Sequence, residues 1–332
     1  MRVQSRATTV VTMVALAAVG TGPAYADGSR TVTGPVTGDA DVFITYVGCD
    51  SLRGTTAAPG SRLNLGPYSA PLGRRSLGIV PAGPGTASGP YAAFGSLAGI
   101  EASVSVAATG GTRGVSHVIA VTPDSPRGTV WSGRADVDVA AGSWTTVAAS
   151  SLVYDWTLVD LTTQAPLAQE GSATTGELAA RHGDGPGFVV TGFGCDGRAF
   201  NLDAVRASGR TLDFEGITLT TTLAVDRRQV PAGDSVTVTG RVTETGGRDT
   251  GDTLVLESRQ PGGAWAPVGD PVLSGPDGIA RVDVPLTETT ELRWHRPESQ
   301  YADEGWSEPV TVTVAEPATP TPTPTPAEGA KQ

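Results

Sequence analysis

Histidine, the side chain most often used as a general acid or base, occurs only three times in the 332 residues, as His117, His182 and His295. His117 lies in an apolar, strand-like run, His182 ends a short helix-like segment, and His295 follows Trp294 in an alternating run. None stands in a motif with a nucleophile, because the chain has neither a Gly-x-Ser-x-Gly elbow nor a Ser-x-x-Lys pair. We therefore predict no catalytic residue and interpret the protein as a non-enzyme.

Carboxylates offer a second kind of chemistry, since a glycosidase needs two of them about 5 to 9.5 Å apart in space. Asp136 and Asp138 alternate with Val137 and Val139, which is typical of a solvated strand face. A glycan-active hydrolase that uses carboxylates of the N-terminal half stays an alternative. Its candidate acids are Glu101, Asp136, Asp138 and Asp203.

Neither a metal nor a cofactor is predicted. The two cysteines are too far apart in sequence for a zinc motif, and the chain has no Walker-type Gly-x-x-x-x-Gly-Lys and no EF-hand loop. Calcium is a weaker alternative, because four aspartates lie near expected turns or strand ends, where oxygen ligands can converge. These are Asp50, Asp184, Asp196 and Asp203.

Aromatic side chains could bind a ligand without any reaction, because sugar rings stack on exposed Trp and Tyr. Tyr68 and Tyr91 lie in the stretch 67–99, which is rich in Gly, Pro, Ser and Ala and predicts long surface loops. Trp131 and Trp144 lie in strand-like runs, where a core position is the more common alternative. Tyr68, Tyr91, Trp131 and Trp144 are the predicted ligand-binding residues.

The N-terminus predicts export. Arg2 and Arg6 form a basic region, residues 7–20 an apolar region, and Ala24-Tyr25-Ala26 a small-x-small cleavage site, so residues 1–26 are interpreted as a secretory signal peptide. No later run has membrane-spanning length. The protein is therefore predicted to be secreted and not inserted in a membrane.

In an oxidising compartment the two cysteines, Cys49 and Cys195, predict one disulfide that closes nearly the whole N-terminal half. Closing a loop of that length with a disulfide stabilises the fold by about 4 to 5 kcal/mol, because it lowers the entropy of the unfolded chain. A pair of buried free thiols is the alternative.

The charge balance is acidic. The formal net charge of −11 becomes −13 if Arg2 and Arg6 leave with the signal peptide, since Lys and Arg fall from 23 to 21 against 34 acids. Such a surface disfavours nucleic acid and anionic lipid as partners, and it keeps an exported protein soluble.

The elements that must position these residues are predicted to be almost all strands. Short β-branched and apolar runs alternate with Gly, Pro, Asn and Asp clusters, which favours an all-β fold over βαβ units. One short helix is expected over 174–182, where Thr174 and Glu177 have capping-box spacing and Gly183 can end the helix. Residues 27–216 are predicted to form a jelly-roll-like β-sandwich, with strands over 41–47, 102–107, 117–122, 135–140, 144–150, 152–159, 188–193 and 200–205.

Two segments of this sandwich echo each other. Residues 42–50, Val-Phe-Ile-Thr-Tyr-Val-Gly-Cys-Asp, match residues 188–196, Phe-Val-Val-Thr-Gly-Phe-Gly-Cys-Asp, in apolar character. We expect the two strands to lie side by side, so that the disulfide joins their ends at one edge of the sandwich.

Residues 217–315 predict a second, antiparallel sandwich. Ser235-Val-Thr-Val-Thr239, Thr253-Leu-Val-Leu-Glu257 and Val310-Thr-Val-Thr-Val314 alternate cleanly, and Pro276-Asp-Gly278 marks a turn. In order and spacing these runs, with Leu292-Arg-Trp294 between them, resemble the bacterial immunoglobulin-like domains of secreted and surface proteins. The resemblance covers about 95 residues and implies a seven-stranded sandwich that spaces, stiffens or adheres, without catalytic residues.

Two further segments bear on the setting of the protein. Residues 193–205 resemble a segment of uncharacterised secreted proteins of high-GC Gram-positive bacteria, a likeness that implies no activity. Residues 316–332 contain four Thr-Pro pairs and predict an extended polyproline-II tail that cannot pack a core.

Together these observations predict a secreted, non-enzymatic modular protein for extracellular binding, adhesion or envelope association. Its expected partner is a cell-wall or extracellular glycan, or a surface protein. The glycan-active hydrolase and a passive structural surface protein are the two alternatives.

Overall fold

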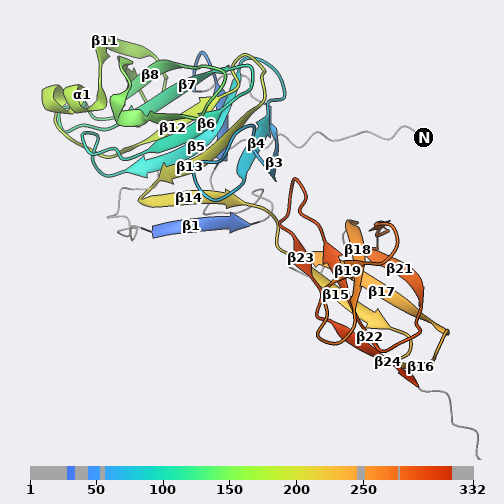
Figure 1. The fold of residues 1–332 in the computed structure, drawn as a ribbon. Helices are drawn as coiled ribbons and strands as arrows, with labels where there is room; N and C mark the ends of the chain where they lie inside the picture. The colour runs from blue at the N-terminus through green and yellow to red at the C-terminus, as the bar shows by residue number, and fades with distance from the viewer. Residues whose placement is uncertain (1–27, 34–43, 53–56, 245–250, 276, 316–332) are drawn as a thin grey trace, which may run out of the picture.

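The computed structural model describes residues 28–33, 44–52, 57–244, 251–275 and 277–315, which form two β-sheet bodies joined end to end (Figure 1). Strands dominate both bodies. The described residues contain one α-helix, α1 (Thr175–His182), and one 3-10 turn, η1 (Ala149–Ser151). The predicted all-β, sandwich-like architecture is confirmed, while the predicted signal peptide and Thr-Pro tail lie outside the described residues.

The first body, called the first sandwich below, has two sheets. Sheet A runs in the order β1-β14-β13-β4-β3, with β6 beside β13 and β9 beside β6. Its β1 and β14 pair in parallel, and the other pairs are antiparallel. The strands are β1 (Gly28–Thr33), β3 (Gly60–Asn64), β4 (Ser76–Val80), β6 (Ser103–Ala107), β9 (Thr145–Ala148), β13 (Phe200–Ala207) and β14 (Arg210–Glu215).

Sheet B carries most of the residues considered for function. Its order is β11-β10-β8-β7-β12-β5-β2, and every neighbouring pair is antiparallel. The strands are β2 (Ile44–Gly48), β5 (Thr86–Phe94), β7 (Thr112–Ala120), β8 (Thr129–Val139), β10 (Tyr154–Asp160), β11 (Pro166–Ala173) and β12 (Gly187–Phe193).

Apolar side chains from both sheets fill the space between them. Leu202 and Phe214 of sheet A meet Phe193 of sheet B in one cluster, and a second cluster surrounds Trp156 and includes Leu178 of α1. All of these side chains are buried. Each contributes roughly 1.5 to 3 kcal/mol or more through burial, so this core determines how the outward faces are held.

The predicted helix is confirmed. Thr174 accepts a hydrogen bond from the backbone N–H of Glu177, and the Glu177 carboxylate accepts one from the backbone N–H of Thr174. Gly183 follows the last turn with a φ of 87°, which glycine adopts without a Cβ clash. Local capping was enough to define this helix.

The prediction of long loops over 67–99 is wrong, because β4 and β5 both lie within this stretch. β5 is an interior strand of sheet B, paired with both β12 and β2. Its small residues permit a close approach: a Cβ added to Gly89 would lie 1.9 Å from the carbonyl oxygen of Thr191. The Gly and Ala content that predicted loops instead reflects tight packing between strands.

The second body, called the second sandwich below, also has two sheets in its described residues, around a core that includes Trp294. One sheet has the order β15-β17-β21, and the other β16-β24-β22-β18-β19, with β20 beside β18 and β23 beside β22. The strands are β15 (Leu219–Val225), β16 (Gln229–Pro231), β17 (Ser235–Glu244), β18 (Thr253–Arg259), β19 (Ala266–Pro267), β20 (Val272–Leu273), β21 (Ile279–Pro285), β22 (Thr290–Arg296), β23 (Gly305–Trp306) and β24 (Val310–Ala315).

Candidate functional site

The disulfide between Cys49 and Cys195 is present, with the two Cα atoms 5.8 Å apart, and joins residues separated by 146 positions. The prediction that β2 and β12 lie side by side is wrong, because β5 lies between them and pairs with both. The two cysteines meet beside the start of β5, where Gly85 accepts a hydrogen bond from Cys49 N–H and donates one to the Cys195 carbonyl. Both strands do end at the same edge of sheet B, called the disulfide edge below.

The disulfide covers a small apolar patch on the outward face of sheet B. Val115 and Val190 point to this face, since their neighbours Val118 and Val189 point into the core and side chains alternate along a strand. The cysteines, Val47 and Ala87 complete the patch. The disulfide therefore packs against the outward face of sheet B.

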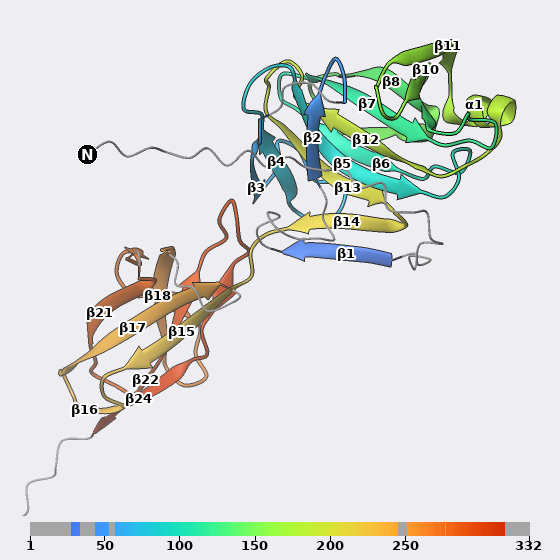
Figure 2. The same cartoon turned by 180° about the vertical axis from the view of Figure 1, so that it is seen from behind.

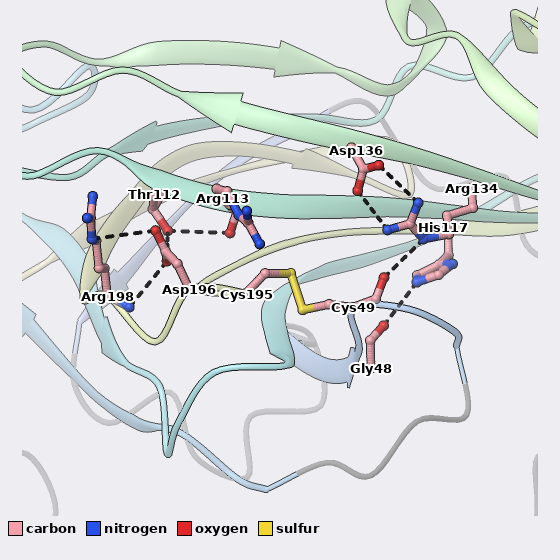
Figure 3. Close-up of a disulfide and its surroundings, with 10 residues drawn as sticks. All are labelled: Gly48, Cys49, Thr112, Arg113, His117, Arg134, Asp136, Cys195, Asp196 and Arg198. Carbon is pink, nitrogen blue, oxygen red and sulfur yellow. Dashed lines mark hydrogen bonds and ion pairs between the residues drawn. A yellow bond between two sulfur atoms is a disulfide. The ribbon is translucent and has the colours of Figure 1, made fainter.

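Polar side chains fasten the Cys49 segment to the same face (Figure 3). The Nε2 atom of buried His117 lies 3.1 Å from the carbonyl oxygen of Gly48, and Arg134 Nε donates to the Cys49 carbonyl at 3.0 Å. Asp136 holds the Arg134 guanidinium through contacts of 2.7 and 3.1 Å. Burial lowers the pKa of His117, partly offset by the Gly48 hydrogen bond, so the imidazole is neutral at pH 7 and donates its proton from Nε2.

An open pocket of about 480 Å³ lies at this edge. Asp196 accepts a hydrogen bond from Thr112 Oγ1 at 3.2 Å and lies 3.7 Å from Arg198 Nε, while Arg198 Nη1 donates to the Gly110 carbonyl at 2.6 Å. These contacts fix one wall in place (Figure 3). The lining residues are Gly110, Gly111, Thr112, Arg113, Asp138, Val139, Ala140, Ala141, Asp196 and Arg198.

Two further charged residues line the pocket. Arg113 of β7 and Asp138 of β8 are direct cross-strand partners, and both side chains are exposed. Within the described ranges neither side chain has a hydrogen-bond or ion-pair partner. A guanidinium and a carboxylate side by side can donate to and accept from the same polar ligand, such as a diol or a group carrying both charges.

The structure does not bring the four predicted aromatic residues together. Trp131 is only 5% exposed, points into the core and lies 4.5 Å from the His182 ring, so it offers no open face for a sugar. Tyr91 projects from the opposite face of sheet B, where its half-buried ring stacks on Phe188 at 5.2 Å. Tyr68 and Trp144 are also half-buried. None of the four lines the pocket.

The predicted carboxylates are also dispersed. Glu101 pairs with Arg206 at 2.7 Å, and Asp136 is held by Arg134. Asp203 is completely buried and accepts hydrogen bonds from the backbone N–H groups of Leu72 and Phe214. Burial raises the pKa of Asp203 to about 6, against the lowering effect of these bonds. Of the four predicted acids, only Asp138 lines the pocket.

The calcium alternative gains no support. The Asp184 carboxylate accepts hydrogen bonds from Ser96 Oγ at 2.6 Å and Ala98 N–H at 3.0 Å, and it lies before β12, whereas Asp196 follows β12 in the pocket. In the part of the chain that the structure describes, no group of three or more His, Cys, Asp or Glu side chains is arranged to hold a metal ion.

The other two histidines have structural partners. His182 contacts Asp124 at 2.8 Å and Glu170 at 3.3 Å; burial lowers its pKa, but these two carboxylates outweigh burial and raise it overall. His295 stacks on Trp306 in the second sandwich, with ring centroids 4.9 Å apart. Both rings are therefore held by contacts within their own sandwich.

The sequence did not predict the aromatic surface of the second sandwich. Trp265 lies against the guanidinium groups of Arg259 and Arg293, at 4.4 and 4.2 Å from its ring centroid, and Trp306 is 43% exposed. It also did not predict Arg113 and Arg198 in the pocket. Alternation along β7 indicates that the Arg113 side chain points outward. It does not indicate that the turn after β12, which carries Asp196 and Arg198, lies beside it.

No protein-family model matches this chain, and a search of curated proteins finds no match to it either. No helix within the described ranges has the length and apolar character needed to cross a membrane.

Proposed function

We propose that this chain is an exported, non-enzymatic binding protein that engages an extracellular or cell-wall glycan through the pocket at the disulfide edge. One observation carries the proposal: Arg113 and Asp138 stand exposed and opposite each other in a pocket of about 480 Å³. Sugar hydroxyls both donate and accept hydrogen bonds, and such a charged pair can satisfy both roles.

Preorganisation supports this assignment. Asp196, Arg198 and the Cys49 segment are each held by hydrogen bonds, and the disulfide joins the two chain segments beside the pocket. A site whose groups are already in place loses less entropy when a ligand binds. In this proposal the second sandwich is an immunoglobulin-like spacer, and the signal peptide delivers the protein to the cell exterior.

Glycan arrays and cell-wall pull-downs with the full mature chain test the proposal, followed by calorimetric titration of any glycan that binds. Arg113→Ala and Asp138→Ala should each weaken binding about tenfold or more, because each removes a charge-assisted hydrogen bond of roughly 1.5 to 3 kcal/mol. The matched controls, Arg127→Ala and Glu308→Ala, remove the same charges from exposed positions outside the pocket and should bind like the wild type. Binding that survives both pocket substitutions would place the ligand elsewhere.

The glycan-active hydrolase is the second candidate, favoured by the fact that Asp138 and Asp196 line the same pocket. Its test is the release of new reducing ends from any glycan that binds. Turnover that Asp138→Asn and Asp196→Asn each abolish would support the hydrolase and reject the binding protein. Absence of any glycan ligand in arrays and pull-downs would favour the passive structural role.

A further inference from the structure

The two sandwiches are connected by a short covalent link. β14 ends at Glu215 and β15 begins at Leu219, so only three residues connect the bodies. Figure 2 shows the second sandwich extending from the end of β14, beside β3 and β4. A short link restricts motion but does not fix an angle, so other contacts decide whether the joint bends.

The segment 298–303 of the second sandwich, between β22 and β23, lies directly against the first sandwich. Backbone N–H groups of Leu65 and Ile217 donate to the carbonyls of Gln300 and Tyr301, at 3.0 and 2.9 Å. Arg62 donates to the Tyr301 hydroxyl at 3.1 Å. We call 298–303 the clasp segment.

Arg75 of the first sandwich is the centre of this contact. Its side chain is 0% exposed, and its guanidinium donates to the Ser299 carbonyl at 3.0 Å and pairs with Glu298 and Asp303. Arg74 adds a second contact to Glu298, at 2.5 Å. Removing one partner of a buried ion pair is destabilising, so the contacts of Arg75 with Glu298 and Asp303 favour the closed joint.

Gly216, in the link itself, shows how closely the parts are packed. A Cβ added there would lie 2.5 Å from the Tyr301 carbonyl oxygen and 3.1 Å from both Cδ and Nε of Arg75. The link, the Arg75 side chain and the clasp segment are therefore closely packed at Gly216, which restricts bending at this point.

We infer that Arg75 and the clasp segment lock the two sandwiches into one rigid arm. Interdomain motion is the usual expectation for two bodies on a short link, and here two segments of the first sandwich and the link itself all contact one segment of the second. The arm holds the disulfide-edge pocket in a fixed orientation relative to the end of β24. This inference stands whether or not the pocket binds a glycan.

Residual dipolar couplings of the full mature chain test the inference, because a rigid pair of bodies shares one alignment tensor. The wild type should fit a single tensor across both sandwiches. Arg75→Met keeps the apolar stem but removes the guanidinium, and it should require two tensors of unequal magnitude. Arg127→Met, a matched change at an exposed arginine away from the joint, should keep the single tensor.

The double variant Glu298→Gln/Asp303→Asn provides an independent version of the same test, because both acids are partly exposed and their neutralisation leaves the first sandwich intact. Couplings that fit well within each sandwich verify folding. A wild type that needs two tensors of unequal magnitude overturns the inference. A single tensor retained by both the Arg75→Met protein and the double variant overturns it as well.

Discussion

The two sandwiches solve one packing problem in different ways. Each buries a tryptophan ring against a glycine: Trp156 lies on its cross-strand partner Gly133 within sheet B, and Trp294 lies on Gly240 of the facing sheet. Trp156 Nε1 donates to the Ala173 carbonyl at 2.9 Å, whereas Trp294 Nε1 is buried without a partner among the described residues. Both cysteines belong to the first sandwich.

This difference shows which forces each body relies on. The first sandwich adds a disulfide and the Trp156 hydrogen bond to its apolar core. The second sandwich relies on apolar burial around Trp294 and on cross-strand ion pairs such as Arg293 with Glu257. Changes to polar and covalent groups should therefore affect the first sandwich more than the second.

Removing the disulfide should give the largest effect. Cys49→Ala/Cys195→Ala reopens a loop of 146 positions, which is expected to lower the free energy of unfolding of the first sandwich by about 4 to 5 kcal/mol. Protection of backbone amides in hydrogen exchange, read separately for each sandwich, measures the loss. Amides in the core of the second sandwich are the internal control and should change by less than about 0.5 kcal/mol. Equal losses in both bodies would contradict the comparison.

Asp203 should give the first sandwich an acid-dependent gain in stability. Its folded pKa is raised by burial from 3.8 to about 6, so the folded state binds the proton more tightly than the unfolded state does. The resulting stabilisation is full below pH 3.8 and is lost as the pH rises through 6. Between pH 7.5 and pH 5 this carboxyl should add about 1 to 1.5 kcal/mol.

The measurement is the free energy of unfolding of the wild type and of Asp203→Asn at both pH values. The variant should lose this pH-dependent gain, while other titrating groups, such as Asp213 with its burial-raised pKa, remain in both proteins. Asp138→Asn, an exposed control, should retain the full gain. Identical pH dependence in Asp203→Asn and wild type would show that this buried carboxyl does not titrate as its surroundings imply.

Replacing the glycines that pack against Trp156 and Trp294 with alanine compares the two tryptophan sites directly. A Cβ at Gly133 would lie 2.8 Å from ring atoms of Trp156, and one at Gly240 would lie 2.6 Å from Trp294 Nε1. Neither ring can move freely, because both are buried, so Gly133→Ala and Gly240→Ala should each cost about 1 to 3 kcal/mol. Gly95→Ala controls for the glycine change alone, because a Cβ there meets no atom within 4 Å and its φ lies outside the left-handed region. A neutral result at either glycine would show that the ring shifts.

Local patterns predicted much of the fold. Period-two alternation predicted most strands of the first sandwich, the capping box predicted α1, and two cysteines in a chain expected to be exported predicted the disulfide. Each of these rests on residues close in sequence or on a simple count. The same reasoning failed for β5, whose glycine and alanine residues are explained only by the strands on either side.

The candidate site was largely beyond such patterns. Its charged walls come from β7, β8 and the turn after β12, and only the tertiary fold brings Arg113, Asp138 and Asp196 together. The same holds for Arg75, which precedes β4 without any distinguishing motif and meets its partners more than 200 positions later. The sequence did predict Asp138 on a solvated strand face, and that is where it lies.

Replacing each tryptophan by phenylalanine isolates the smallest difference between the sandwiches. Trp156→Phe loses ring area and the hydrogen bond to the Ala173 carbonyl, whereas Trp294→Phe loses ring area and a buried N–H that has no partner among the described residues. A hydrogen bond contributes about 0.5 to 1.5 kcal/mol, so Trp156→Phe should cost about 1 kcal/mol more than Trp294→Phe. Hydrogen exchange of amides in each core measures the loss in unfolding free energy for each variant under the same conditions. Subtracting one loss from the other removes most of the cost of the smaller ring, which both variants share. Equal costs would mean that the indole N–H of Trp156 adds nothing to the stability of the first sandwich, so that the hydrogen bond present at Trp156 and absent, among the described residues, at Trp294 has no energetic consequence.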